Sequence, residues 1–186
     1  MATADPSKGA ALLRVEQPVR VWLIALALVW ALTLLATLAA ATIPPLASAA
    51  RELLALRLVP ATNPPPSLGR VFAIAAHNIQ TAGWPLLLPL LGAQDRAWSR
   101  TLADGAVLAS VAVNAVLVGL ALGAYHARLL PYAPQLPLEW AGVAVAPADW
   151  WLRRDGTRRG HRVAAVALVA LLVVAAVVET VFVPHR

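Results

Sequence analysis

Two glutamates lie in parts of this chain that are otherwise apolar. Glu179 falls inside the last long apolar run, 163–183, and Glu139 follows Pro137 at the start of another apolar stretch. A carboxylate in such surroundings is costly unless it is paired, protonated or directed into a protein interior, so these residues mark functional or assembly sites. Two facing carboxylates could carry acid-base chemistry, line an ion or proton pathway, or bind neighbouring helices through hydrogen bonds.

Amide and imidazole side chains interrupt two further apolar stretches. They add hydrogen-bond donors and acceptors that could pair with the two carboxylates. Together with the glutamates they form the predicted buried polar cluster, which comprises His77, Asn78, Gln80, Asn114, Glu139 and Glu179.

The known catalytic templates do not occur in this chain. It has no GxSxG elbow, no HExxH pair and no Walker loop, and its four histidines, at 77, 126, 161 and 185, lack the spacing of metal ligands. There is also no cysteine, which excludes disulfides and thiolate sites. We therefore expect no catalytic, cofactor-binding or metal-binding residue, with intramembrane hydrolysis by Glu139 and Glu179 as the remaining enzymatic alternative.

The composition identifies an integral membrane protein. Of 186 residues, 60% are hydrophobic and only 13% are charged, and the mean hydropathy is +0.72; soluble domains are about 45–50% apolar and about 25% charged. The net charge of +6 falls mostly in short loops that flank apolar runs. This distribution indicates membrane topology and excludes nucleic acid as a partner.

Apolar runs long enough to cross a bilayer predict an all-α bundle of about five transmembrane helices. A cytoplasmic leader, 1–20, precedes a single transmembrane domain, 21–186. A cleaved signal peptide is the alternative for the first run, and a short amphipathic piece, 47–58, follows it. The predicted spans are 21–43, 71–92, 102–127, 129–151 and 163–184.

Prolines and glycines shape these spans. Pro85 is expected to break the second span, and Pro134 and Pro137 to break the fourth, leaving a continuous helix over 138–151. A re-entrant hairpin is the alternative for the fourth region. Gly119 and Gly123, four residues apart, predict a small-residue face where the third span contacts another helix.

The distribution of basic residues orients the bundle. With five crossings and a cytoplasmic N-terminus, ten Lys and Arg residues lie inside and five lie outside, as the positive-inside rule requires. We expect a multi-pass protein of the bacterial inner membrane. A basic cytoplasmic loop then supplies a predicted partner-docking surface made by Arg153, Arg154, Arg158 and Arg159.

This topology places the ionisable groups at a common depth. His77 lies about 9 Å and Glu179 about 7 Å below the outer boundary, from the helical rise per residue, and Glu139 falls in the same slab. His77 is therefore expected to pair with Glu139 or Glu179. Three interpretations stay open: snorkelling to the outer headgroups, hydrogen bonding that holds the helices together, and a pathway or catalytic role.

The order of these polar landmarks resembles the stage II sporulation protein M family over residues 70–184. In that family a buried asparagine, an Asn-Gly-rich helix, a Pro-His-Gly-x-x-Glu motif and a closing Ala-x-x-Glu-x-x-x-x-Pro pattern recur on a five-helix membrane domain. The chain departs from the family pattern at Gln135, Leu136 and Ala115. Its matching residues are Asn78, Asn114, Pro134, Glu139, Glu179 and Pro184.

The resemblance implies a membrane component of a larger envelope assembly. We expect a non-enzymatic integral membrane subunit of a multiprotein complex, whose buried Asn, His and Glu residues organise helix packing and partner docking. The alternative is the permease subunit of an ABC-type transporter or exporter, with the ATPase in another chain. The expected partners are the lipid bilayer, other membrane proteins, a second copy of this chain, or a cytoplasmic ATPase subunit.

Overall fold

The computed structural model describes residues 6–55, 67–129, 133–154 and 160–182, and every regular element among them is helical. The long helices are α1 (Pro6–Thr42), α3 (Leu68–Gly83), α4 (Ala97–Tyr125) and α7 (His161–Phe182). Shorter helices connect or flank them: α2 (Pro44–Ala55), α5 (Leu136–Val143) and α6 (Val145–Arg153), with the 3₁₀ turns η1 (Trp84–Leu87) and η2 (His126–Arg128).

Three of these helices are long and apolar enough to cross a membrane. They are Gln17–Thr42 within α1, Ala97–Tyr125 and His161–Phe182. The prediction of an all-helical membrane protein is thereby confirmed in its coarse form. The first helix differs from the prediction because it begins at Pro6, so most of the expected leader continues the same helix.

The second predicted span is not one helix. α3 ends at Gly83, after 16 residues, and the chain continues as the 3₁₀ turn η1 and further turns up to the start of α4. Pro85 explains the change, because it has no N–H and its ring clashes with the carbonyl one turn earlier. With 16 residues, α3 is therefore shorter than the three helices among the described residues that are long enough to cross a membrane.

The fourth predicted span also differs in detail. Pro137 lies in the first turn of α5, where a missing N–H is tolerated, so this proline starts a helix and does not break one. The expected continuous helix over 138–151 is divided into α5 and α6, which meet at Ala144. Pro147 lies in the first turn of α6, and its ring excludes the carbonyl of Val143 from a helical hydrogen bond.

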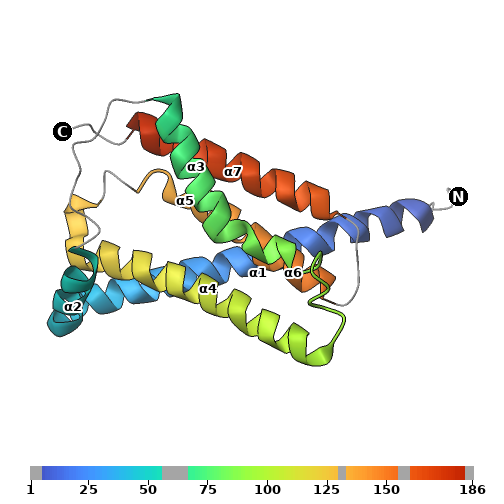
Figure 1. The fold of residues 1–186 in the computed structure, drawn as a ribbon, viewed down its shortest axis with the longest axis horizontal. Coiled ribbons are helices and arrows are strands. Elements are labelled where there is room, and N and C mark those ends of the chain that lie inside the picture. The colour runs from blue at the N-terminus through green and yellow to red at the C-terminus, as the bar shows by residue number, and fades with distance from the viewer. Residues whose placement is uncertain (1–5, 56–66, 130–132, 155–159, 183–186) are drawn as a thin grey trace, which may run out of the picture.

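The elements alternate in direction along the long axis of the molecule. α1, α4 and α7 run one way, while α3 and the α5–α6 pair run the opposite way, so that the N-terminal and C-terminal ends lie at opposite ends of the molecule (Figure 1). The starts of α4 and α7 and the end of α6 lie toward the end from which α1 enters. α2 and the start of α3 lie toward the other end.

α1 and α4 make the tightest contact of the bundle. Gly119 and Gly123 of α4 are buried against α1, and a methyl group on Gly119 would fall 2.7 Å from Cβ of Ala36. A methyl group on Gly123 would fall 2.7 Å from Cβ of Ala40. The predicted small-residue contact face is therefore confirmed, because only glycine allows the two backbones to come so close.

Candidate functional site: a polar cavity between α3, α4 and α5

A hydrogen bond joins two of the helices that carry the predicted cluster. The amide Nδ2 of Asn78, in α3, donates to Oε1 of Glu139, in α5, at 3.3 Å. Both side chains are half-buried. Glu139 is in the first turn of α5, where the helix dipole favours a negative charge.

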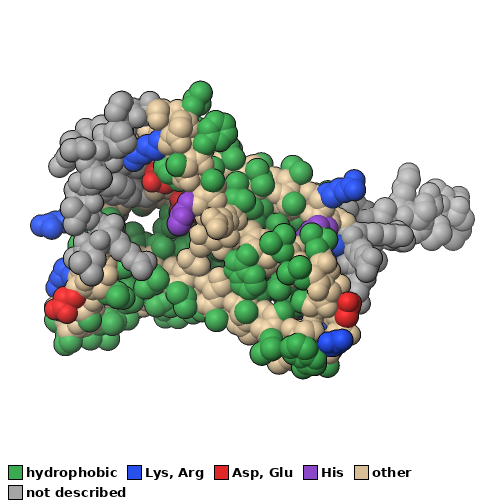
Figure 2. All heavy atoms as spheres, in the orientation of Figure 1, with side chains coloured by type: hydrophobic (Ala, Val, Ile, Leu, Met, Phe, Trp, Pro, Cys, Tyr) green, Lys and Arg blue, Asp and Glu red, His purple; other side chains and the backbone are tan. Residues whose placement is uncertain are grey.

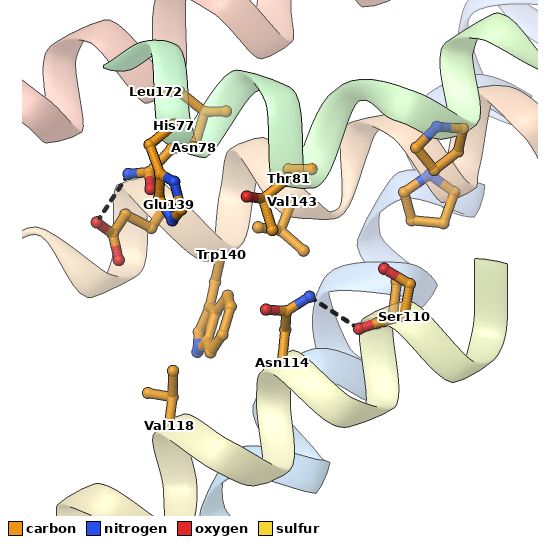
Figure 3. Close-up of a pocket in the computed structure, with 14 residues that line it drawn as sticks. His77, Asn78, Thr81, Ser110, Asn114, Val118, Glu139, Trp140, Val143 and Leu172 are labelled. Carbon is orange, nitrogen blue, oxygen red and sulfur yellow. Dashed lines mark hydrogen bonds between the residues drawn. The ribbon is translucent and has the colours of Figure 1, made fainter. Parts of the chain in front are cut away.

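The pair lies at a cavity of about 160 Å³ between α3, α4 and α5. Figure 3 shows the side chains of the three helices directed toward this space. The wall is apolar at Val118, Val143 and Leu172. Its polar lining consists of His77, Asn78, Thr81, Ser110, Asn114 and Glu139, together with the indole of Trp140.

The α4 side of the cavity is held by local hydrogen bonds. Asn114 Nδ2 donates to the carbonyl oxygen of Ser110 at 2.9 Å, one turn earlier. The indole Nε1 of Trp84, in η1, donates to Oγ of Ser110 at 3.3 Å and so links the break after α3 to α4. The bond to Ser110 uses one of the two N–H donors of the Asn114 amide within its own helix and leaves Oδ1 as an acceptor.

Trp140 also lines this cavity, and it carries a donor that is buried. Its side chain is only 3% exposed, and its Nε1 has no hydrogen-bond partner among the described residues. Oε1 of Gln135, one turn earlier, is likewise buried without a partner. Unpaired buried polar atoms of this kind are rare in proteins.

The structure brings four of the six predicted cluster residues together and leaves two apart. His77, Asn78, Asn114 and Glu139 line the cavity, with His77 largely exposed at its rim. Gln80 is exposed and lies outside the lining, because it is on another face of α3. The expected ion pair of His77 with a glutamate is not among the ion pairs of the described residues. Glu139 instead accepts a hydrogen bond from Asn78.

Glu179 lies beside the cavity and not in its wall. Its carboxyl interacts electrostatically with Glu139 and, with the opposite sign, with the guanidinium of Arg70 at the start of α3. α3 and α7 are in extensive contact. The cation that acts on Glu179 is therefore the guanidinium of Arg70, whereas the sequence predicted the imidazole of His77 for this role.

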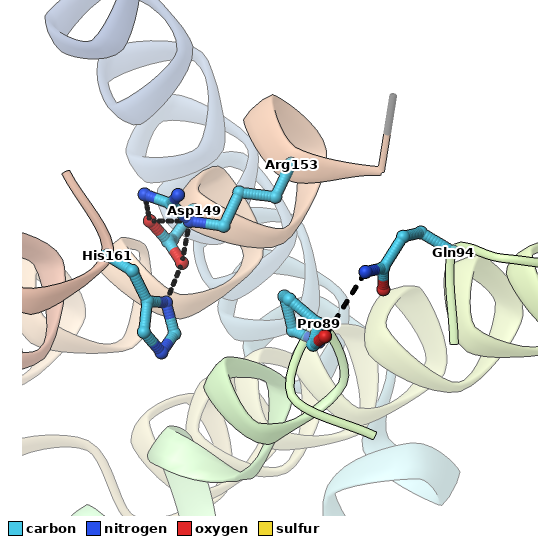
Figure 4. A network of polar contacts seen from close by, with 5 residues as sticks. All are labelled: Pro89, Gln94, Asp149, Arg153 and His161. Carbon is cyan, nitrogen blue, oxygen red and sulfur yellow. Dashed lines mark hydrogen bonds and ion pairs between the residues drawn. The ribbon is translucent and has the colours of Figure 1, made fainter. Parts of the chain in front are cut away.

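A second polar network, which the sequence interpretation did not identify, lies near the junction of α6 and α7. Oδ1 and Oδ2 of Asp149 both accept from Nε of Arg153 at 2.8 Å, and Nδ1 of His161 lies 2.8 Å from Oδ2 of Asp149 (Figure 4). Asp149 is 4% exposed and Arg153 is 5% exposed. The spacing of four residues between them was a detectable signal, because such pairs meet on one helix face.

These contacts correct the predicted docking surface. Arg153 is buried against Asp149 and is not displayed on the surface. Arg154 is 3.1 Å from Oδ2 of Asp104, in α4, and its guanidinium stacks over the ring of Trp151 at 4.3 Å. Arg158 and Arg159 lie outside the described residues.

Among the described residues, no group of three or more His, Asp or Glu side chains could hold a metal ion. Comparison of the chain with protein-family models, curated proteins and solved structures gives no match. The functional argument therefore depends on the geometry of the two polar networks and on the surfaces around them.

Proposed function

We propose that this protein is a non-enzymatic integral membrane subunit of a multiprotein envelope complex. The observation that carries the proposal is the Asn78–Glu139 hydrogen bond, which joins α3 to α5 beside a polar cavity. Polar groups at membrane depth are costly, and here they are used between helices of one chain. The arrangement favours a role in holding a defined helix packing over a role in breaking covalent bonds.

The proposal includes five crossings with the N-terminus in the cytoplasm of a bacterial cell. Its support is the alternating direction of α1, α3, α4, α5–α6 and α7 along the molecule (Figure 1). The basic residues add to that support, because the starts of α4 and α7, to which Arg96 and Arg162 belong, lie near the end from which α1 enters.

Exposed apolar side chains favour an assembly. α7 displays a series of exposed valines, Val163, Val166, Val173, Val177 and Val181, at helical spacing. Lipid covers some such surface in any membrane protein, and partner helices cover it in a complex. The resemblance to the stage II sporulation protein M family, through Asn78, Asn114, Glu139 and Glu179, points to the same class of role and belongs to this proposal.

A second candidate is the permease subunit of an ABC-type transporter or exporter. The cavity of about 160 Å³ favours it, because polar side chains from three helices converge on a space of solute size. In that case the ATP-hydrolysing subunit is a separate chain that docks at the basic end of the bundle.

Site-specific photocrosslinking separates the two candidates. A photoreactive residue at Arg162, exposed at the start of α7, samples the basic end, and one at Leu53, exposed on α2, samples the opposite end. Envelope proteins crosslinked without a nucleotide-binding subunit are expected for the scaffold role. A nucleotide-binding subunit crosslinked from Arg162 alone would favour the permease.

A second measurement accompanies the crosslinking: the size of the native particle in mild detergent. A discrete species larger than the 19.5 kDa chain is expected. A homogeneous monomer that supports normal growth of a deletion strain, with no crosslinked protein from either position, contradicts the proposal.

A further inference from the structure

The cavity between α3, α4 and α5 is elongated along the helices. On α4 its lining includes Ser110, Asn114 and Val118, which follow one another at intervals of four residues. This spacing puts the three side chains on one face of the helix, over about 12 Å of its length. The side chains of Thr81 and Asn114 are directed into the same space (Figure 3). The cavity is therefore a polar cleft that extends over about two helical turns.

The two ends of this cleft differ in exposure. One end lies at His77, which is exposed, and at Glu139 in the first turn of α5. The other end lies at Pro85, which is buried where α3 breaks. Figure 2 shows a hollow beside a histidine and acidic side chains, toward the end of the molecule where α3 begins. The cleft therefore opens at the end marked by His77.

Water can reach polar atoms inside the cleft. Oδ1 of Asn114 and Oε2 of Glu139 accept no hydrogen bond from the described residues. Neither oxygen is among the buried side-chain atoms of those residues that lack a partner, so both have accessible surface. The volume of about 160 Å³ has room for about five water molecules, at about 30 Å³ each. Because polar groups of three helices can bind this water, the cleft favours water over an empty space.

The charge of the cleft is negative near its open end. Glu139 lines it, and neither lysine nor arginine is among the described residues that do so. The carboxyl of Glu179 acts on Glu139 with the same sign, while the guanidinium of Arg70 acts on Glu179. A cleft lined by one sign of charge concentrates counter-ions and excludes ions of like charge. The open end should consequently admit cations and reject anions.

We infer that the cavity between α3, α4 and α5 is a water-filled vestibule that admits small cations from the end of the molecule where α3 begins. Its occupants are hydrated cations, attracted by the charge of Glu139 and bound by amide and hydroxyl oxygens deeper inside. The polar residues then do more than hold the helices together, because they bring water and cations to the middle of the bundle. The inference goes beyond the proposed subunit role and takes from it only the crossing of the membrane by α3, α4 and α5–α6.

Cysteine accessibility tests whether water fills the cleft, because the chain contains no cysteine of its own. Asn114 lines the cleft near the middle of α4, while Val113, one residue earlier, is 56% exposed and lies outside the lining. The thiolate is the reactive form, and apolar surroundings suppress it. A permanently charged cationic methanethiosulfonate should modify Asn114→Cys in native membranes about 10-fold faster or more than Val113→Cys, which lipid covers. Val118→Cys, at an apolar position of the lining, provides the same readout if Asn114→Cys fails to fold.

A cationic and an anionic reagent of similar size test the charge selectivity at pH 8, where a hydrated carboxylate is ionised. The probes are trimethylammonioethyl and sulfonatoethyl methanethiosulfonate, and each rate is divided by the rate with 2-mercaptoethanol. At Asn114→Cys the cation should then react about 10-fold faster than the anion or more, because Glu139 attracts one and repels the other. Glu139→Gln in the same background should lower this ratio by about 3-fold or more. Glu52→Gln, at an exposed position of α2, is the control and should leave the ratio unchanged.

Three results would overturn the inference: similar rates at Asn114→Cys and Val113→Cys, no modification of any lining cysteine from either side of the membrane, or a rate ratio that does not favour the cation or is unchanged by Glu139→Gln. The ratio with Glu139 intact remains decisive if Glu139→Gln fails to fold. Intact cells and inverted vesicles are both treated, and modification in inverted vesicles alone would reverse the proposed orientation but still support the vestibule. Complex formation is measured separately, so failure of this test leaves the proposed subunit role standing.

Discussion

Asn78 and Glu139 lie 61 residues apart in the chain, yet the amide of one donates to the carboxylate of the other at 3.3 Å. This bond crosses from α3 to α5, two helices that share few other contacts. α3 instead packs mainly on α7. The polar bond therefore fixes a helix pair that apolar packing alone holds weakly.

Removal of the Asn78 amide is expected to destabilise the fold modestly. Asn78→Ala should lower the free energy of unfolding by about 0.5–2 kcal/mol, the range for hydrogen bonds inside membrane proteins and to carboxylates. Denaturant unfolding in detergent measures the change. Gln80→Ala, at an exposed position of the same helix, is the matched control and should leave stability unaltered. A double-mutant cycle of Asn78→Ala with Glu139→Gln should show nonadditive changes in stability. Strict additivity would mean that the hydrogen bond between the two side chains does not contribute to stability.

Glycine substitutions in α4 should separate contact positions from free positions. Gly119→Ala places a methyl group against Ala36 of α1 and should destabilise by about 1–3 kcal/mol, the usual effect of overpacking. Gly105→Ala meets nothing within 4 Å and should be neutral or stabilising by up to about 1 kcal/mol, since alanine is the better helix former. Thermal unfolding of both variants measures the contrast. Equal effects at the two positions would mean that α1 and α4 do not approach as described.

The buried charge network should be sensitive to loss of one partner. Asp149→Asn replaces the carboxylate that binds the buried guanidinium of Arg153 with a neutral amide, and a decrease of about 3–5 kcal/mol in stability is expected. The double variant Asp149→Leu with Arg153→Met removes both charges and should recover much of that loss. Asp95→Asn, at an exposed position, serves as the control. If the double variant is as unstable as the single one, then the packing of these side chains, and not their charge pairing, determines the loss of stability.

Single cysteines can test the proposed topology, because the chain contains none. Thr101→Cys, exposed at the start of α4, should react with an impermeant maleimide only from the cytoplasmic side. Glu52→Cys, exposed on α2, should react only from the outer side. Labelling of intact cells and of inverted vesicles distinguishes the two. Reaction of both residues from the same side would contradict the crossing proposed for α3, which lies between them in the chain.

The sequence by itself determined the class of protein. Long apolar runs, few charges and glycines four residues apart predicted an all-helical membrane protein with a close contact through Gly119 and Gly123. These features are local or periodic, and helix formation satisfies backbone hydrogen bonds within each segment. The break after α3 could also be predicted from the sequence, because Pro85 disrupts a helix through its own ring and its missing N–H.

Only the tertiary structure decided which polar groups meet. Asn78 rather than His77 faces Glu139, Arg70 serves Glu179, Gln80 points away, and Arg153 turns inward to Asp149. Helix length and depth place a residue at a level in the membrane but leave the rotation of each helix about its axis open. That rotation follows from packing against neighbouring helices, such as the fit of glycines in α4 onto α1, and it selects the side chains that enter the interior.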